Sequence, residues 1–190
     1  MILVAGIAAQ VLIQTMNSLE EQALKTGEEA LRDVSGGIEV TRVSGYYDGN
    51  NITQLAAIIS PTVASQDIDL AYTYISLSDS NKKVILNYTS SCHASTPSNG
   101  LFGTVNSSNL SSSTFGILVI RDIDGSCTSS NPIINGRDLV VLLVNTTKCF
   151  LGIDTRTEVF GNVHPEYGIS GVISFTTPAA FVNTIIELQP

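Results

Sequence analysis

Basic residues are scarce in this chain of 190 residues. Nine lysines and arginines stand against 17 aspartates and glutamates, a net charge of −8, and the nine are scattered along the chain. Without a basic stripe, nucleic acid is not expected as a partner. Charged residues make up only 14% of the chain and hydrophobic residues 43%. This balance favours a protein that buries surface on assembly, or one kept soluble by Ser, Thr, Asn and attached sugar.

Catalytic motifs are also missing from the sequence. It contains no Gly-x-Ser-x-Gly, no His-Glu-x-x-His and no phosphate-binding loop. The two histidines, His93 and His164, stand alone in different segments and are more typical of surface or turn positions. The carboxylates Asp67 and Asp69 could serve a hydrolase, but the apolar strands around them indicate the end of a turn. We therefore do not expect an enzyme.

Cysteine is rare as well, with three residues at positions 92, 127 and 149. No Cys-x-x-Cys spacing occurs, so a zinc site is not expected. In an extracellular setting the sequence allows one disulfide. Cys92 and Cys127 are the candidates because both fall in predicted loops, although three pairings exist and one thiol must be left over.

A long helix is predicted for the first 35 residues, before Gly36 and Gly37 end it. From Met1 to Ile13 the only polar side chain is Gln10. Beyond that point a narrow apolar stripe recurs at steps of three and four between charged residues, formed by Leu12, Met16, Leu19, Ala23, Thr26 and Ala30. Such a helix would be about 50 Å long at 1.5 Å per residue.

The apolar end of this helix cannot remain in water. Thirteen residues are too few to cross a bilayer, which needs about twenty. No basic segment precedes them, so they do not form a signal peptide. We expect that the chain starts inside a longer apolar helix and that residues 1–36 form a polymerisation helix; an interfacial segment, or packing on the chain's own head, are the alternatives. The expected polymerisation residues are Leu3, Ile7, Val11, Leu12, Met16 and Leu19.

Residues 37–190 are predicted to form a β-sandwich head, because the apolar period changes from helical to alternating after the glycines. The expected strands are 38–43, 55–59, 70–77, 83–88, 115–121, 139–145, 158–163 and 171–175, with a last edge strand at 185–188. Residues 90–113 are polar and are expected to form a long loop, with Leu101 and Phe102 as a small anchor in the core. The predicted fold class is α+β, a long N-terminal helix followed by an immunoglobulin-like antiparallel β-sandwich, although the buried tryptophan typical of immunoglobulin domains is missing.

Five Asn-x-Ser/Thr sequons mark candidate glycosylation sites, at Asn51, Asn87, Asn106, Asn109 and Asn145. Asn106 and Asn109 lie in the polar loop and are expected to be accessible. Asn145 ends a predicted buried strand and is a weaker candidate. The alternative is that these are polar loops without sugar.

The segment from Arg121 to Ser126 carries two carboxylates, Asp122 and Asp124, in a sharp turn. Two such carboxylates can face one point, and Ca²⁺ prefers six to eight oxygen ligands at about 2.4 Å. The segment is not an EF-hand, because the twelfth residue from Asp122 is Ile133. Further ligands would have to come from Ser126, Asp138, Asn131 or Asn135. The alternative is an Asp-Gly hairpin turn that needs no metal.

Both ends of the chain resemble one protein family. The run from Ile2 to Thr15, with 19–28 and 34–38, is similar to the N-terminal helix of archaellins, the archaeal flagellins, which share this helix with type IV pilins. Segments 120–126, 136–140, 161–168 and 175–178 match the family's pattern in order. The family's mature chain starts several residues earlier, behind a short basic leader that a prepilin-type peptidase removes, and neither is present in this sequence.

The resemblance implies a structural subunit of the archaellum, an extracellular filament rotated for swimming. Helices of many copies would form the core with the heads outside, other archaellins would be the partners, and membrane contact would occur only before assembly. The family also has a metal site in the head, which favours structural Ca²⁺ at Asp122 and Asp124. The alternatives are a type IV pilin, or a cell-surface adhesion or receptor ectodomain held in the membrane by the same helix.

Overall fold

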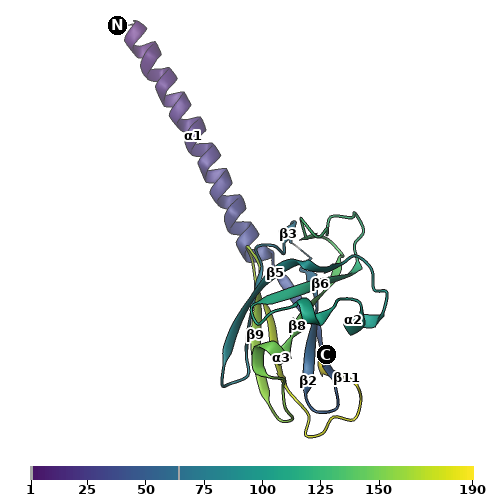
Figure 1. Ribbon diagram of the computed structural model, residues 1–190. Coiled ribbons are helices and arrows are strands. Elements are labelled where there is room, and N and C mark those ends of the chain that lie inside the picture. The colour runs from purple at the N-terminus through teal and green to yellow at the C-terminus, as the bar shows by residue number, and fades with distance from the viewer. Residues whose placement is uncertain (1, 64) are drawn as a thin grey trace.

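The computed structural model describes residues 2–63 and 65–190, the side chains of Ile2, Leu3 and Arg32 excepted. Helix α1 (Ile2–Ser35) projects from a β-rich head formed by the rest of the chain (Figure 1). The strands of the head are β1 (Ile38–Tyr47), β2 (Ile52–Pro61), β3 (Ile68–Asp69), β4 (Tyr74–Ser78), β5 (Lys83–Ala94), β6 (Thr114–Arg121), β7 (Ile133–Ile134), β8 (Leu139–Asn145), β9 (Glu158–His164), β10 (Gly171–Thr176) and β11 (Ile185–Gln189). Its short helices are α2 (Gly100–Gly103), the 3-10 turn η1 (Ser107–Asn109) and α3 (Thr146–Phe150).

Nine of the strands form one sheet in the order β10-β9-β4-β5-β6-β8-β2-β1-β11, and β3 pairs with β7 beside it. Neighbouring strands run antiparallel except β5 and β6, which are parallel. The two ends of the sheet approach each other. The side-chain amide of Gln189 in β11 accepts a hydrogen bond from the Ser174 amide (2.9 Å) and donates one to the Val172 carbonyl (3.2 Å) of β10. The α+β, sandwich-like fold is thus confirmed, with one curled sheet and a parallel pair that the sequence did not indicate.

A strand is present in each expected range, and β1, β2 and β5 extend beyond the predicted ranges. The strand expected at 70–77 begins only at Tyr74, because residues 70–73 form a turn closed by the Thr73 amide and the Leu70 carbonyl. The two-residue strands β3 and β7 were missed because two residues carry no readable alternation. Residues 90–113 were wrongly expected to form only a loop. Strand β5 continues to Ala94, and α2 and η1 follow.

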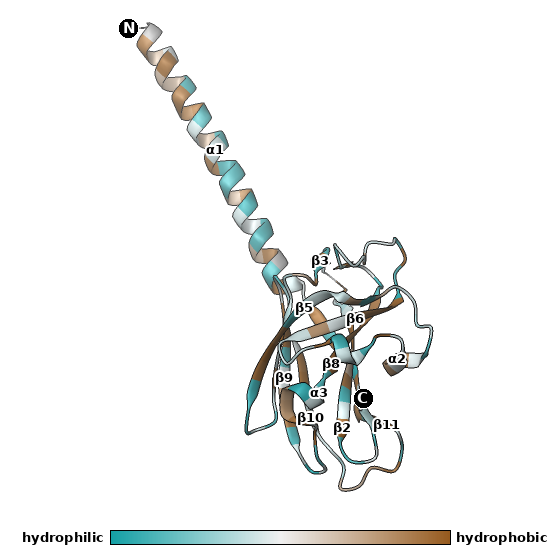
Figure 2. Cartoon of the chain, viewed as in Figure 1, coloured by the Kyte–Doolittle hydropathy of each residue, from teal (hydrophilic) through white to brown (hydrophobic). Residues whose placement is uncertain are grey.

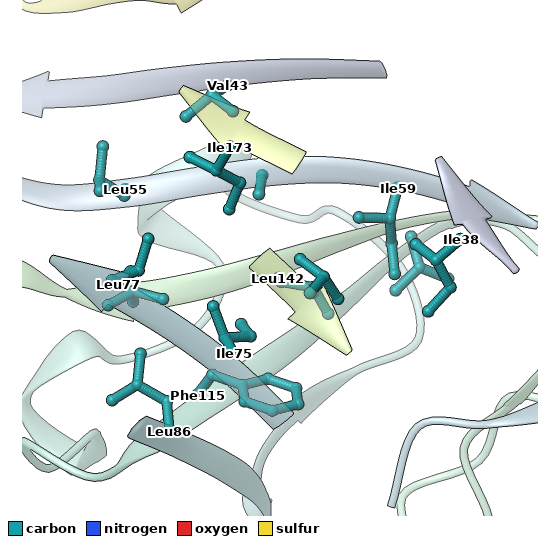
Figure 3. Close-up of a cluster of buried hydrophobic side chains, with 14 of the residues drawn as sticks. Ile38, Val43, Leu55, Ile59, Ile75, Leu77, Leu86, Phe115, Leu142 and Ile173 are labelled. Carbon is teal, nitrogen blue, oxygen red and sulfur yellow. The ribbon is translucent and has the colours of Figure 1, made fainter. Parts of the chain in front are cut away.

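The main core lies inside the curled sheet (Figure 3). Its inward side chains come from most of the strands and from the start of β1, and they include Ile38, Leu55, Ile75, Leu77, Leu86, Phe115, Leu142 and Ile173. The central strands β6 and β8 were predicted to be buried on both faces, and residues 115–119 and 140–145 are buried without alternation.

A second apolar cluster explains why those strands have no solvent-facing side. The segment after β5 folds over the outer face of β2, β6 and β8 and packs Phe102, Val105 and Leu110 against Leu118 and Leu143. Phe102 therefore is an anchor, as predicted, but it packs against the outer face of the sheet and not in the main core. Removing this segment would expose apolar residues on three strands.

The junction between α1 and the head is made by Gly36 and Gly37, which end the helix as predicted. The Ile169 amide donates to the Gly36 carbonyl (2.9 Å), and the Ile38 amide donates to the Ile169 carbonyl (3.0 Å). From the other side, the Gly37 amide donates to the Ser65 hydroxyl (2.7 Å). The junction is therefore held by two separate loops, although helix and head touch little elsewhere (Figure 1).

Candidate functional site

The surface of α1 is the first candidate site. Every described side chain from Val4 to Ser35 is exposed. Val4, Ile7 and Val11 are exposed to 72%, 64% and 56%, values that core residues of a folded domain do not show. The helix is brown along its free end and mixed teal and brown toward the head (Figure 2), which matches the predicted change from an apolar to an amphipathic segment.

Most of the expected polymerisation residues lie on this exposed surface: Ile7, Val11, Leu12, Met16 and Leu19. The side chain of Leu3 lies outside the described residues. Leu24, Leu31 and Val34 were missed and are exposed to 62%, 70% and 74%, because they lie beside the stripe read from the sequence. The apolar surface therefore continues along the whole helix. No described helix is long and apolar enough to span a membrane.

The second candidate is the acidic turn after β6. Carboxylate oxygens of Asp122, Asp124 and Asp138 all lie within 4.8 Å of one another. Asp138, the residue before β8, is only 1% exposed. In the described part of the chain the ion pair found joins Arg42 to Glu187, so none of the three carboxylates forms an ion pair with a described lysine or arginine. Three negative charges this close repel each other, and a cation between them would relieve that repulsion.

Backbone amides organise the turn around Asp122. Its Oδ1 accepts hydrogen bonds from the amides of Gly125 (2.8 Å) and Ser126 (3.2 Å), and its Oδ2 accepts one from Cys127 (3.1 Å). Gly125 has a φ of 75°, a conformation that glycine adopts without strain. The carboxylate is thus fixed by its own turn.

Asp138 and Asp124 are held by the loop that leads into β8. Asp138 accepts hydrogen bonds from the amides of Ile123 (3.3 Å) and Asn135 (3.0 Å). Asn135 also donates from Nδ2 to Asp124 Oδ2 (2.8 Å), and this bond, with others from Ser126, lowers the pKa of Asp124 to about 2. Asn135 thus donates to the cluster in this arrangement rather than offering it a further oxygen.

Ser126 was also an expected ligand. Its hydroxyl donates to the Ile133 carbonyl (3.0 Å), which ties the turn to β7. Asn131, a further candidate, closes a neighbouring turn, because its amide donates to the Thr128 hydroxyl (3.2 Å). The structure therefore brings three of the expected carboxylates together and uses the other candidates mainly to brace the loops.

The five sequons lie in different surroundings. Asn87 in β5, and Asn106 and Asn109 at η1, are exposed, whereas Asn51 is half-buried in the β1–β2 turn. Asn145 is only 8% exposed. Its Oδ1 caps α3 by accepting from the Lys148 amide, and its Nδ2 donates to the Ser107 carbonyl (2.9 Å). The folded head therefore disfavours sugar at Asn145, because the nitrogen that would carry it already donates a hydrogen bond within a buried side chain.

The disulfide that the sequence allowed between Cys92 and Cys127 is not formed in this structure. Both residues, and Cys149, are free buried thiols. Cys92 packs in the second apolar cluster and Cys127 in the main core. Burial raises the pKa of Cys127 to about 12 and that of Cys149 to about 11, so both thiols are held in the protonated, unreactive form.

Comparison with known proteins identifies the family. The family model for archaeal-type flagellin matches residues 1–175. Flagellin B2 of Methanocaldococcus jannaschii is 42% identical over all of this chain and 89% of its own length, and flagellin B1 of Methanococcus voltae is 36% identical with the same coverage. The crystal structure of archaeal flagellin FlaB1 from M. jannaschii covers 81% of this chain and 97% of its own, with a TM-score of 0.74 and 38% identity.

A second solved structure extends the likeness to the helix. The archaeal flagellum of Methanospirillum hungatei covers all of this chain and 92% of its own, with a TM-score of 0.66, although 11% identity makes this a likeness of fold alone. The long exposed helix, the curled β-sheet head and the matches along the whole chain agree: this chain belongs to the archaeal-type flagellins.

Proposed function

We propose that this flagellin, a structural subunit of the archaellum filament, assembles through α1. The apolar surface of α1 packs against the same helix of neighbouring subunits, and the β-rich heads lie around that core. The observation that carries the proposal is the exposure of the helix. Its large apolar side chains from Val4 to Val34 have no cover from the head. Burying each one contributes about 1.5–3 kcal/mol, and only other copies offer a matching surface along the whole length.

The test is to introduce two charged residues into the apolar surface of α1 in the full chain. Ile7→Asp with Val11→Asp places two carboxylates where neighbouring helices would exclude water, so filaments should disappear from electron micrographs of the native host. The matched control, Asn17→Asp with Gln22→Glu, adds the same charge at polar positions of the same helix and should leave filaments intact. Normal filaments from the first variant would contradict a core role for α1.

The chain has no proposed catalytic role. Archaeal-type flagellins are structural proteins, and none of the catalytic motifs sought in the sequence is present. The two histidines lie in β5 (His93) and β9 (His164), and neither belongs to the carboxylate cluster of the acidic turn. The carboxylates are better explained as a structural site.

We further propose that a hard cation such as Ca²⁺ binds between Asp122, Asp124 and Asp138. Three features support it: the short separation of the carboxylate oxygens, the near-complete burial of Asp138, and the lack of a described basic partner. Water and free carbonyl oxygens of the turn would complete the coordination that Ca²⁺ needs. The ion would fasten the end of β6 to the start of β8, far from one another along the chain.

Sugar on the exposed sequons is the last part of the proposal. Asn87, Asn106 and Asn109 present their side chains to solvent, with Asn51 as a less accessible candidate. Attached sugar would account for the solubility of a head whose charged residues are few. Intact-mass and glycopeptide analysis of protein from the native organism tests it. Unmodified mass there would contradict it.

A further inference from the structure

Three residues on adjacent strands form a cross-strand row on the outer face of the sheet. Tyr74 in β4 pairs with His164 in β9 on one side and with Asn87 in β5 on the other. Directly paired residues point to the same face with Cβ atoms about 5 Å apart. The row therefore places the aromatic ring of Tyr74 between an imidazole and the asparagine of the Asn87-Tyr88-Thr89 sequon.

The Tyr74 ring is held in place from the His164 side. The two rings stack with centroids 4.6 Å apart and planes 24° apart. His164 is itself fixed, because Nδ1 lies 2.9 Å from the Ser170 hydroxyl and Nε2 lies 3.5 Å from that of Ser76. Tyr74 nevertheless remains 41% exposed, and its hydroxyl has no hydrogen-bond partner among the described residues. A rigid, exposed ring with a free hydroxyl is thus presented beside Asn87.

We propose that a glycan on Asn87 lies against Tyr74, with the C–H face of its first pyranose on the ring and its hydroxyl groups within reach of the Tyr74 hydroxyl. Sugar C–H groups carry partial positive charge, and the face of an aromatic ring is negative. The inference rests on the glycosylation proposed above.

Asn87 has an aromatic ring, that of Tyr74, directly across from it on the neighbouring strand. Its side chain has no hydrogen-bond partner in the described part of the chain, so Nδ2 is available. Asn106 instead lies at the start of η1, where its Oδ1 accepts a hydrogen bond from the Ser108 amide (2.9 Å). A sugar on Asn87 therefore has the exposed face of an aromatic ring beside it.

The test is a thermodynamic cycle on filaments purified from the native host. Thr89→Ala removes the sequon but keeps Asn87, and Tyr74→Val removes the ring but keeps a strand-forming residue. If the sugar rests on the ring, Tyr74→Val should lower Tm by about 2–4 °C more in the sugar-bearing protein than in the Thr89→Ala background. Tyr74→Phe keeps the ring, so it should change Tm by nearly the same amount in the sugar-bearing protein and in the Thr89→Ala background. Ser108→Ala, which removes the Asn106 sequon, is the control and should leave the effect of Tyr74→Val unchanged.

Glycopeptide mass spectrometry of the same filaments separates the outcomes. Sugar at Asn106 or Asn109 but not at Asn87 would overturn this inference and leave the wider glycosylation proposal standing. Protein without any sugar would overturn both. Sugar at Asn87 with an equal Tm loss for Tyr74→Val in the two backgrounds would overturn the stacking. A filament map with a neighbouring head packed on Tyr74 would do the same.

Discussion

Gly168 and Gly36 meet backbone to backbone where α1 enters the head: a β-carbon on Gly168 would lie 2.3 Å from the Gly36 carbonyl oxygen. The next residue, Ile169, donates its amide to that same carbonyl at 2.9 Å. Gly168 also has a φ of 83°, which L-residues rarely adopt. The orientation of the helix relative to the head therefore depends on a contact that only glycine allows.

Gly168→Ala should weaken this junction. The new methyl group must displace the Gly36 carbonyl and also adopt a strained backbone, so we expect a loss of about 1–3 kcal/mol in the free energy of unfolding. Hydrogen exchange should rise at 36–38 and 168–170. Calorimetry and exchange of the full-length protein measure both.

Gly100→Ala separates the two causes of that loss. Gly100 has a similar φ of 69°, but no described heavy atom lies within 4 Å of its hypothetical β-carbon. Its substitution should cost only the backbone strain, about 1 kcal/mol. Equal losses from the two variants would show that the close approach at Gly36 is unimportant.

Calcium should stabilise the head if the three clustered carboxylates bind it. After stripping with EDTA, added Ca²⁺ should raise Tm, because the ion binds only the folded arrangement; at a hundredfold excess over its Kd the gain is about 2.7 kcal/mol. Asp124→Asn, which preserves the shape of an exposed side chain, should reduce the gain, and Asp138→Asn should abolish it. Asp154→Asn, at an exposed position outside the cluster, is the control. An unchanged Tm with the wild type would leave only a hydrogen-bonded turn.

Acid should weaken the metal-free turn through Asp124. The folded-state pKa of Asp124 is lowered to about 2, first by the hydrogen bond from Asn135, whereas an unfolded aspartate titrates near 3.9. The carboxylate therefore contributes stability above about pH 4 and loses it as pH falls toward 2. In EDTA, Asn135→Ala should remove part of this acid dependence. Parallel wild-type and variant unfolding curves between pH 5 and 2 would contradict the assignment.

Thiol titration should find no disulfide in the native protein. The three cysteines are free and buried, so a thiol reagent should react slowly with folded protein and with three groups after denaturation. Cys92→Ala and Cys127→Ala should each cost stability only through lost packing. If only one thiol reacts in denaturant without reductant, the protein contains a disulfide, as the sequence suggested.

The sequence alone predicted those elements whose apolar residues follow a local pattern. Helix α1, its apolar end and its stop at Gly36 follow from a helical period and from glycine's preference for helix ends. Strands β6 and β8 follow from continuous apolar runs, although the pattern did not reveal what covers their second face. Phe102 and its neighbours cover that face, and they belong to a segment whose sequence shows no helical or alternating pattern.

Only the tertiary structure decided which residues from distant parts of the chain lie next to each other. Asp122 and Asp124 are neighbours in sequence, but Asp138 joins them only because β8 pairs with β6. In the same way, Tyr74 lies beside Asn87 through the register of β4 and β5, while Cys92 and Cys127 pack in different apolar clusters. Local periodicity reports how a residue alternates between water and core, and it contains no information about which strand will be its neighbour, because register is set by the burial of the whole sheet.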